Sequence, residues 1–328
     1  MKFIEPEVSE SINRLTYLWP NLEVKVLADR ITDSGTAELW FYHINGKTDS
    51  LLHIAKVNLL ASSTMTQLAK RMKEHSEQIP WTEVMTYLSA KTIEYSRRGE
   101  PGVVIEPVPG QAVHPGYYVE PLIMKGVPNI MFGDKGVNKT TICLTLIGIV
   151  RIGLIDSPLG LFCDKPASVA LLDWESTKPL TDYTMSRLIE GKTIPWFSLP
   201  YLRCKQSLAD DIDRIANFLH DNKTELVLID SLGQAAGSEK FDTAGKAVAL
   251  RFFEALRQLN VTSLIIAQNS KGEDNKKTIY GSTYFTYYAR NIFEVKAKQD
   301  QLDEDKMHMI LLQEESNYSK KHQPIGFE

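Results

Sequence analysis

The chain has few cysteines and no pattern among them. It contains 328 residues, and its three cysteines, Cys143, Cys163 and Cys204, are far apart in the sequence. A small, odd number of thiols excludes a disulfide framework and is typical of a reducing compartment. There is no CxxC pair, and the seven histidines include no HExxH motif, so the sequence offers no standard set of zinc ligands.

Long apolar runs and an excess of one charge are also missing. The longest apolar run, Ile142–Val150, ends at Arg151, far short of the ~20 residues that a membrane-spanning helix needs. The start, MKFIEPEVSE, lacks the basic and then apolar pattern of a signal peptide. The net charge of −4 disfavours a polybasic nucleic-acid binder but leaves room for a local basic loop. We therefore expect a cytoplasmic protein with no membrane partner.

What is present is the composition of a globular protein, with 43% hydrophobic and 24% charged residues. The patterns predict a small α+β N-terminal domain over residues 1–98, a Pro/Gly-rich linker over 99–118 and a larger domain over 119–328. In the N-terminal domain, residues 1–20 are predicted to be a loosely structured lead-in. Three strands between residues 23 and 60 and then two helices are predicted to follow it.

The larger domain has a regular rhythm of strand, loop and helix. Continuous apolar segments such as SVALLDWE and ELVLID alternate with amphipathic ones such as ADDIDRIANFLHDN. This alternation predicts an α/β fold, with a mostly parallel sheet covered by helices on both faces.

The strongest chemical signal is a phosphate-binding loop between a predicted strand and a predicted helix. The P-loop pattern GxxxxGK[ST] uses backbone N–H groups and a helix N-terminus to hold phosphates. Lys139 would then reach the β- and γ-phosphates, and the Thr140 hydroxyl would coordinate Mg²⁺. The candidate ATP-binding residues of this loop are Gly133, Asp134, Lys135, Gly136, Val137, Asn138, Lys139, Thr140 and Thr141.

One residue departs from the P-loop pattern. Asn138 stands where the second glycine is expected. Because this position lies close to the phosphates, a side chain there could weaken nucleotide binding or turnover.

Acidic residues at the ends of two apolar strands suit the rest of a hydrolytic site. Asp230 ends ELVLID and is predicted to hold Mg²⁺ as the Walker-B carboxylate. Hydrolysis also needs a group that orients or deprotonates water. Glu175, at the end of SVALLDWE, is the first candidate for this role and Asp173 the second. Both could instead be solvated strand-end residues or helix caps.

A third strand, VTSLIIAQNSKG, ends in polar residues that could sense the γ-phosphate. Gln268 and Lys271 are the candidates. The loop over residues 270–283 also carries Lys276, Lys277 and Tyr280, a combination that suits the backbone and bases of single-stranded DNA. The alternative is a solvated loop without a ligand.

The motifs GDKGVNKTT, LLDWE, LVLIDSLG and IIAQNSKG, in this order, resemble those of the RecA-like P-loop ATPases of the AAA superfamily. The nearest resemblance is to the RepA-type hexameric replicative helicases of plasmids and phages. The resemblance implies a RecA-like core, ATP and Mg²⁺ as cofactors, and a homo-oligomeric ring. It also implies catalytic roles for Lys139 and Glu175, and an arginine finger at Arg290 offered to a neighbouring subunit.

Three functional hypotheses remain open on the sequence. The first is an ATP-hydrolysing helicase or translocase that acts in replication or recombination of a mobile element. The second is an ATP-dependent switch or loader with slow or no turnover, because Asn138 replaces the glycine. The third is an interaction protein with a degenerate P-loop.

Overall fold

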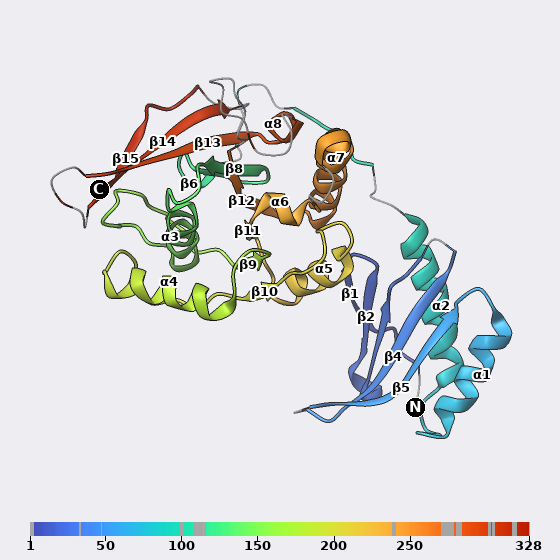
Figure 1. Cartoon of the computed structure of the whole chain (residues 1–328). Coiled ribbons are helices and arrows are strands. Elements are labelled where there is room, and N and C mark those ends of the chain that lie inside the picture. Colours follow the sequence, from blue (N-terminus) through green and yellow to red (C-terminus); the bar gives the residue numbers. More distant parts are fainter. Residues whose placement is uncertain are drawn as a thin grey trace. The chain divides into compact units, whose positions relative to one another are not determined.

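The chain folds into two compact units, Met1–Gln111 and Ala112–Glu328. They are seen in a computed structural model (Figure 1). The residues that the structure describes are 3–32, 34–46, 48–98, 102–107, 110, 114, 116–237, 241–269, 279, 284–300, 303, 306–316 and 320–327.

The N-terminal unit is a five-stranded antiparallel sheet with two helices (Figure 1). The strands follow one another in chain order, from β1 at one edge to β5 at the other. One face of the sheet packs with both helices into a single apolar core. The elements are β1 (Glu7–Ser11), β2 (Arg14–Trp19), β3 (Val24–Asp29), β4 (Thr36–Ile44), β5 (Asp49–Asn58), α1 (Ser62–Lys73) and α2 (Trp81–Arg98).

The predicted lead-in over residues 1–20 is wrong, because this segment supplies two of the five strands. In β2 the side chains of Leu15, Tyr17 and Trp19 are buried, and those between them are half-buried. This alternation is that of a strand with one covered face. The alternation of RLTYLW was visible in the sequence as a strand signal, whereas the polar β1 carries no such signal and is recruited by pairing with β2.

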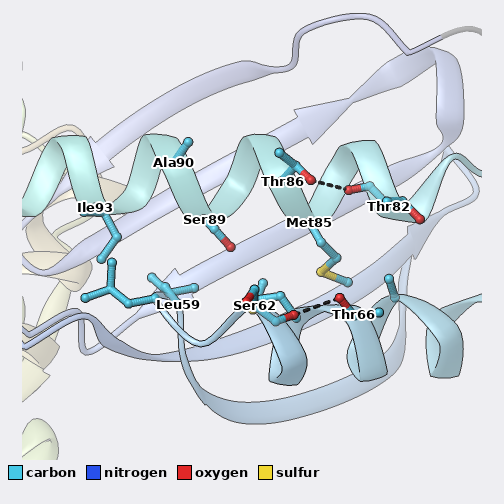
Figure 2. A pocket seen from close by; sticks show the side chains of 12 residues that line it. Leu59, Ser62, Thr66, Thr82, Met85, Thr86, Ser89, Ala90 and Ile93 are labelled. Atoms are coloured by element: carbon cyan, nitrogen blue, oxygen red, sulfur yellow. Dashed lines mark hydrogen bonds between the residues drawn. The ribbon is translucent and has the colours of Figure 1, made fainter.

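The helices α1 and α2 leave an apolar cavity of about 430 Å³ (Figure 2). Leu59, Met65, Met85 and Ile93 contribute to its wall. Two hydroxyls of the wall, those of Thr66 and Thr86, donate to carbonyls of their own helices at 2.8 Å. The described residues that line the cavity carry no charge.

The C-terminal unit is built on an eight-stranded sheet in the order β10-β9-β11-β12-β8-β13-β14-β15. The first six of these strands are parallel, and β14 and β15 add an antiparallel edge. Two further strands, β6 (Tyr117–Val119) and β7 (Ile123–Met124), form a separate antiparallel pair. The strands of the large sheet are β8 (Pro128–Gly133), β9 (Val169–Asp173), β10 (Tyr201–Arg203), β11 (Leu226–Asp230), β12 (Thr262–Gln268), β13 (Asn291–Gln299), β14 (Met307–Ser316) and β15 (Ile325–Phe327).

Helices cover both faces of this sheet (Figure 1). One core lies between the sheet and α3 and α4, and a second lies between the sheet and α5, α6, α7 and α8. The predicted fold class is therefore confirmed: a mostly parallel α/β core follows a small α+β unit in the chain. The helices are α3 (Lys139–Ile152), α4 (Lys178–Glu190), α5 (Ile212–Asp221), α6 (Leu232–Ala235), α7 (Phe241–Leu259) and α8 (Tyr284–Tyr288).

Candidate nucleotide-binding site

The predicted phosphate loop joins β8 to α3. Two of its glycines are required by the backbone. At Gly133 a Cβ atom would lie 2.4 Å from the carbonyl oxygen of Val295 on the neighbouring strand β13. Gly136 has a φ of 85°, in the left-handed region that side chains disfavour. The sequence therefore forms a tight turn that leads directly into the N-terminus of α3, where unpaired N–H groups attract anions.

Lys139 is the first residue of α3, and it is folded back over the loop. Its side chain is largely buried, and its Nζ donates to the carbonyl oxygens of Gly133 and Asp134 at 2.9 and 2.6 Å. Burial lowers the pKa of this ammonium group. A positive charge thus lies within the loop, and its protein partners are neutral carbonyl groups that an anion can replace.

Asn138 occupies the left-handed region, with φ 57° and ψ 32°. Asparagine tolerates this conformation better than most residues with a side chain. The Asn138 side chain is exposed, and its Nδ2 lies 3.3 Å from the sulfur of Met307 at the start of β14. Asn138 thus stands in place of the glycine with an allowed backbone conformation. Its side-chain amide contacts the β13–β14 hairpin.

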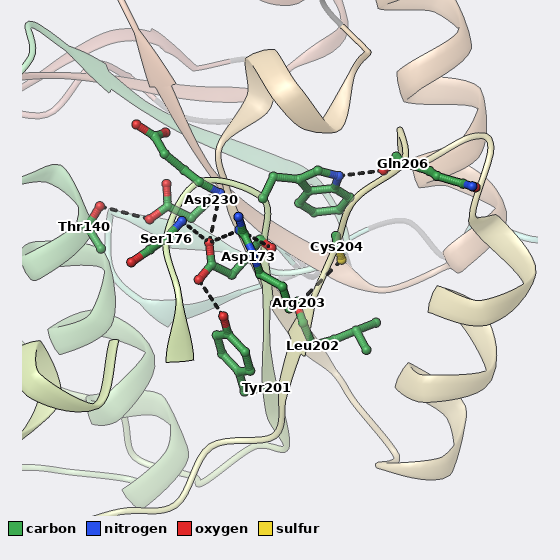
Figure 3. Close-up of polar contacts among 11 residues, drawn as sticks. Thr140, Asp173, Ser176, Tyr201, Leu202, Arg203, Cys204, Gln206 and Asp230 are labelled. Carbon is green, nitrogen blue, oxygen red and sulfur yellow. Dashed lines mark hydrogen bonds and ion pairs between the residues drawn. The ribbon is translucent and has the colours of Figure 1, made fainter. Parts of the chain in front are cut away.

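The strand β12 lies between the P-loop strand β8 and the strand β11 that ends in Asp230. The carboxyl ends of parallel strands meet at one edge of the sheet, where ligands of such folds bind. There the Thr140 hydroxyl donates to Asp230 Oδ2 at 2.9 Å (Figure 3). The two residues predicted to hold Mg²⁺, 90 positions apart in the chain, are therefore in contact.

The pair Thr140–Asp230 fits a hard cation by its chemistry. Mg²⁺ prefers hydroxyl, carboxylate and water oxygens. Burial raises the pKa of Asp230 to about 6, although the hydrogen bond from Thr140 acts in the opposite direction. A carboxylate that is costly to ionise without a partner favours binding of a positive ion beside it.

Glu175 lies just beyond the end of β9, and its side chain is exposed. Its Oε1 is 3.5 Å from Nε2 of Gln268, which ends β12. The predicted catalytic carboxylate and one of the two predicted sensors therefore approach each other across the end of β11, which lies between β9 and β12. An exposed carboxylate next to an amide is a suitable arrangement for orienting a water molecule.

Asn269 is a residue whose contribution the sequence analysis did not identify. Its Nδ2 donates to Asp134 Oδ1 at 2.8 Å, and its backbone N–H donates to the Gly133 carbonyl at 3.2 Å. It thus fastens the phosphate loop to the end of β12. The available signal was its place directly after Gln268 at the end of an apolar strand.

The remaining candidates are spread around the loop or lie elsewhere. Lys135 is exposed, Val137 packs partly on the core beneath α3, and the Thr141 carbonyl accepts a hydrogen bond from Thr145 within the helix. Arg290 is exposed, and its backbone N–H donates to the carbonyl of Pro128, at the end of β8 opposite to the loop. Within one chain Arg290 is therefore remote from Lys139, and a role in a neighbouring subunit stays a prediction.

Two other predictions fall where the structure gives no description. Lys271, and the loop 270–283 except Ile279, lie outside the described residues.

The described part of the chain has no cluster of three or more acidic, histidine or cysteine side chains arranged for a metal. It also has no helix of the length and apolarity that crossing a membrane requires.

Comparisons with known proteins give a likeness in fold. No protein-family model matches the chain, and no curated protein matches it. Among solved structures, a KaiC-like protein from the hyperthermophilic archaeon Pyrococcus horikoshii is similar, with 13% identity and a TM-score of 0.46. The alignment covers 67% of this chain and 95% of that one. At this identity the likeness concerns the fold alone.

Proposed function

We propose that this chain binds ATP with Mg²⁺ and hydrolyses it. The observation that carries the proposal is that Thr140 contacts Asp230 at the carboxyl edge of the sheet, while Lys139, the residue before Thr140, lies over the phosphate loop. Lys139 supplies charge for the β- and γ-phosphates, and Thr140 and Asp230 supply oxygen ligands for Mg²⁺. The neutral partners of Lys139 in the loop support this role, since phosphate oxygens can take their place.

Glu175 is proposed to orient the attacking water and to accept its proton. Water attacks the γ-phosphorus, the bond from that phosphorus to the β–γ bridging oxygen breaks, and ADP and phosphate leave. The exposure of the Glu175 carboxylate and its approach to Gln268 support this assignment. When Mg²⁺ is bound, it neutralises charge that develops on the phosphate oxygens.

The test is phosphate release by the purified full chain with Mg²⁺ and ATP. We expect Lys139→Ala to lower turnover by roughly 10²-fold or more, the scale for loss of one preorganised electrostatic contact. We expect Glu175→Gln to lower turnover by roughly 10²–10⁴-fold, to a residual rate that can still be measured, and to retain ATP binding. Lys165→Ala, which removes an exposed lysine of the same unit, is the matched control and should leave the rate unchanged. Turnover that survives Lys139→Ala would contradict the proposal.

The finer proposal is a helicase or translocase of the RepA type, acting as a ring on single-stranded DNA. It is supported by the order of the sequence motifs and by the lysines of the loop 270–283. A motor of this kind should hydrolyse ATP several-fold faster when single-stranded DNA is added. A rate that stays low with and without DNA favours the alternative, a switch or loader.

A further inference from the structure

A buried polar cluster lies directly behind Glu175. It consists of the buried Asp173 and the half-buried Tyr201 and Arg203, from the neighbouring parallel strands β9 and β10 (Figure 3). Asp173 is 1% exposed although it is a carboxylate at the end of a strand. A buried charge costs several kcal/mol unless it is paired and hydrogen-bonded, so its partners indicate what it does.

Both oxygens of Asp173 accept hydrogen bonds from the protein. Oδ1 accepts from the backbone N–H groups of Glu175 and Ser176 at 2.9 and 2.7 Å, and from Arg203 at 3.2 Å. Oδ2 accepts from the Tyr201 hydroxyl at 2.9 Å. These four donors leave Asp173 poorly placed to take a proton from water, which removes the case for it as the second catalytic candidate.

The same contacts fix the backbone that carries Glu175. The N–H groups of residues 175 and 176 converge on one carboxylate oxygen, so the turn after β9 closes over Asp173. The preceding residue, Trp174, is held as well. Its backbone N–H donates to the Asp230 carbonyl at 2.6 Å, and its indole N–H donates to the Gln206 carbonyl at 2.7 Å. The Glu175 side chain is exposed, but the backbone N–H groups of residues 174, 175 and 176 each donate a hydrogen bond.

Arg203 and Tyr201 offset the cost of burying the Asp173 carboxylate. The Arg203 guanidinium bonds both the side chain and the backbone carbonyl of Asp173. Burial and the contact with Asp173 both raise the pKa of Tyr201, so its hydroxyl remains a donor. All three residues come from the ends of two hydrogen-bonded strands, where Arg203 pairs with Asp173 in register.

We infer that Asp173, held by Tyr201 and Arg203, is a positioning residue that sets where the Glu175 carboxylate lies relative to Gln268. This inference rests on the proposed ATPase function. It assigns to Asp173 an effect on the chemical step that acts through Glu175, and no contact with ATP, Mg²⁺ or water. Misplacing a catalytic group by about 1 Å can cost roughly 10²-fold in rate.

The test is a double-mutant cycle between Asp173 and Glu175, measured as kcat and KM for ATP in the full chain. Asp173→Ala should lower kcat about 10-fold to 100-fold and leave KM and the Kd for ATP within about twofold. On a Glu175→Gln background the same change should alter the residual kcat by less than about twofold, because a residue that acts only through Glu175 has nothing left to position.

Two further variants keep the test decisive even where Asp173→Ala is poorly folded. Asp173→Asn retains an oxygen for the two backbone N–H groups and an amide for Tyr201, whose hydroxyl can accept as well as donate. It should recover most of the lost kcat. Tyr201→Phe should lower kcat by less than Asp173→Ala does, and this loss should also vanish on the Glu175→Gln background. The control Asp182→Ala, which removes an exposed ion-paired carboxylate of α4, should change nothing.

The outcomes separate the inference from the function on which it rests. A wild-type chain without ATP turnover contradicts the proposed function. Turnover that falls with Glu175→Gln but not with Asp173→Ala overturns the inference alone. An equal loss from Asp173→Ala on both backgrounds, or a raised Kd for ATP, also overturns it, since either result indicates a general structural role.

Discussion

The two units differ in what their interiors hold. In the described part of the N-terminal unit the buried polar side chain is Thr92, whose hydroxyl is 2.8 Å from that of Tyr17. Among its described residues the C-terminal unit buries four charged side chains, Lys139, Asp173, Asp230 and Glu294. Buried charge costs stability and is retained where chemistry needs it. The difference supports the assignment of the proposed chemistry to the C-terminal unit.

Buried polar groups in the C-terminal unit are of two kinds. At the amino end of the sheet, Asn291 donates to Asn129 Oδ1 at 3.0 Å and accepts from Gln313 at 2.8 Å, which joins β8, β13 and β14. These amides are neutral and paired with one another, as in a structural network. The charged groups Lys139, Asp173 and Asp230 lie at the carboxyl end instead. Three of the four buried charged groups thus belong to the candidate site, whereas the fourth, Glu294 of β13, is ion-paired with Lys296.

The largest predicted effect is a loss of stability in the N-terminal core, and it tests whether ATP turnover is independent of that unit. Trp81 is fully buried, donates its indole N–H to the Ser76 carbonyl at 3.0 Å, and meets the Phe41 ring edge to face at 6.1 Å between centroids. Trp81→Ala should cost this unit about 3–5 kcal/mol of unfolding free energy. ATP turnover of the full chain should stay within about twofold. Denaturant unfolding and phosphate release on the same samples check both results.

Trp196→Ala is the matched control for this prediction, since Trp196 is 74% exposed and lies in the other unit. It should change neither the unfolding free energy nor the ATP turnover appreciably. Turnover that falls in parallel with N-terminal unfolding in Trp81→Ala would show that the chemistry depends on both units, and the comparison would fail.

The second prediction concerns how much the buried carboxylate of Asp230 lowers the stability of the fold. Burial raises the pKa of Asp230 to about 6 from the ordinary value of 3.8. At about 1.4 kcal/mol for each pH unit, ionised Asp230 destabilises the metal-free fold by about 3 kcal/mol. Asp230→Asn keeps an oxygen for the Thr140 hydroxyl. In the presence of a chelator at pH 7 it should raise the unfolding free energy by up to this amount, and it should abolish turnover with Mg²⁺.

The sign of this effect is fixed by pH. Above pH 6 the carboxyl is ionised in both the folded and the unfolded chain, so its cost is fully present. As the pH falls from 6 to about 4, the folded form gains its proton first, and the advantage of the asparagine variant disappears. Asp210→Asn is the opposite control, because hydrogen bonds from Ser207 and Arg251 hold the pKa of Asp210 below its ordinary value. That variant should not be stabilised. An Asp230→Asn protein no more stable than wild type at pH 7 would contradict the prediction.

The fold was largely predictable because its strands and helices carry their own periodicity. The apolar runs of β9, β11 and β12 are buried along their length, and such runs indicate a parallel sheet without knowledge of its partners. β1 was not predictable in this way, since four of its five residues are polar and its strand state comes from pairing with β2. The pairing of two segments cannot be predicted from the residue pattern of either segment alone.

The candidate site was predictable as a set of residue types, but not as a set of contacts. Lys139 and Thr140 follow from the loop pattern, and Asp230 follows from its place at a strand end. The sequence left Asp173 and Glu175 as alternatives because both end the same apolar segment. Their environments differ only in the folded chain, where β10 brings Tyr201 and Arg203 to Asp173 and leaves Glu175 exposed.

The smallest predicted effect tests whether the left-handed backbone conformation at Asn138 lowers the stability of the fold. Asn138 in this loop and Asn13 at the turn between β1 and β2 are both left-handed, with φ 57° and 50°. Glycine adopts this region freely but loses more entropy on folding, so Asn→Gly at either position should change the unfolding free energy by less than about 1 kcal/mol. The two substitutions form a matched pair, one in each unit.

ATP binding should distinguish the two glycine variants only if the Asn138 side chain obstructs the phosphates. Because this side chain is exposed and directed to Met307, we expect the Kd for ATP in Asn138→Gly to stay within about threefold of wild type, a difference of less than 1 kcal/mol. Calorimetry with Mg²⁺ and ATP measures it, with Asn13→Gly as the control. Binding that tightens tenfold or more in Asn138→Gly alone would mean that asparagine restrains the loop, and the switch would then be the better description than the motor.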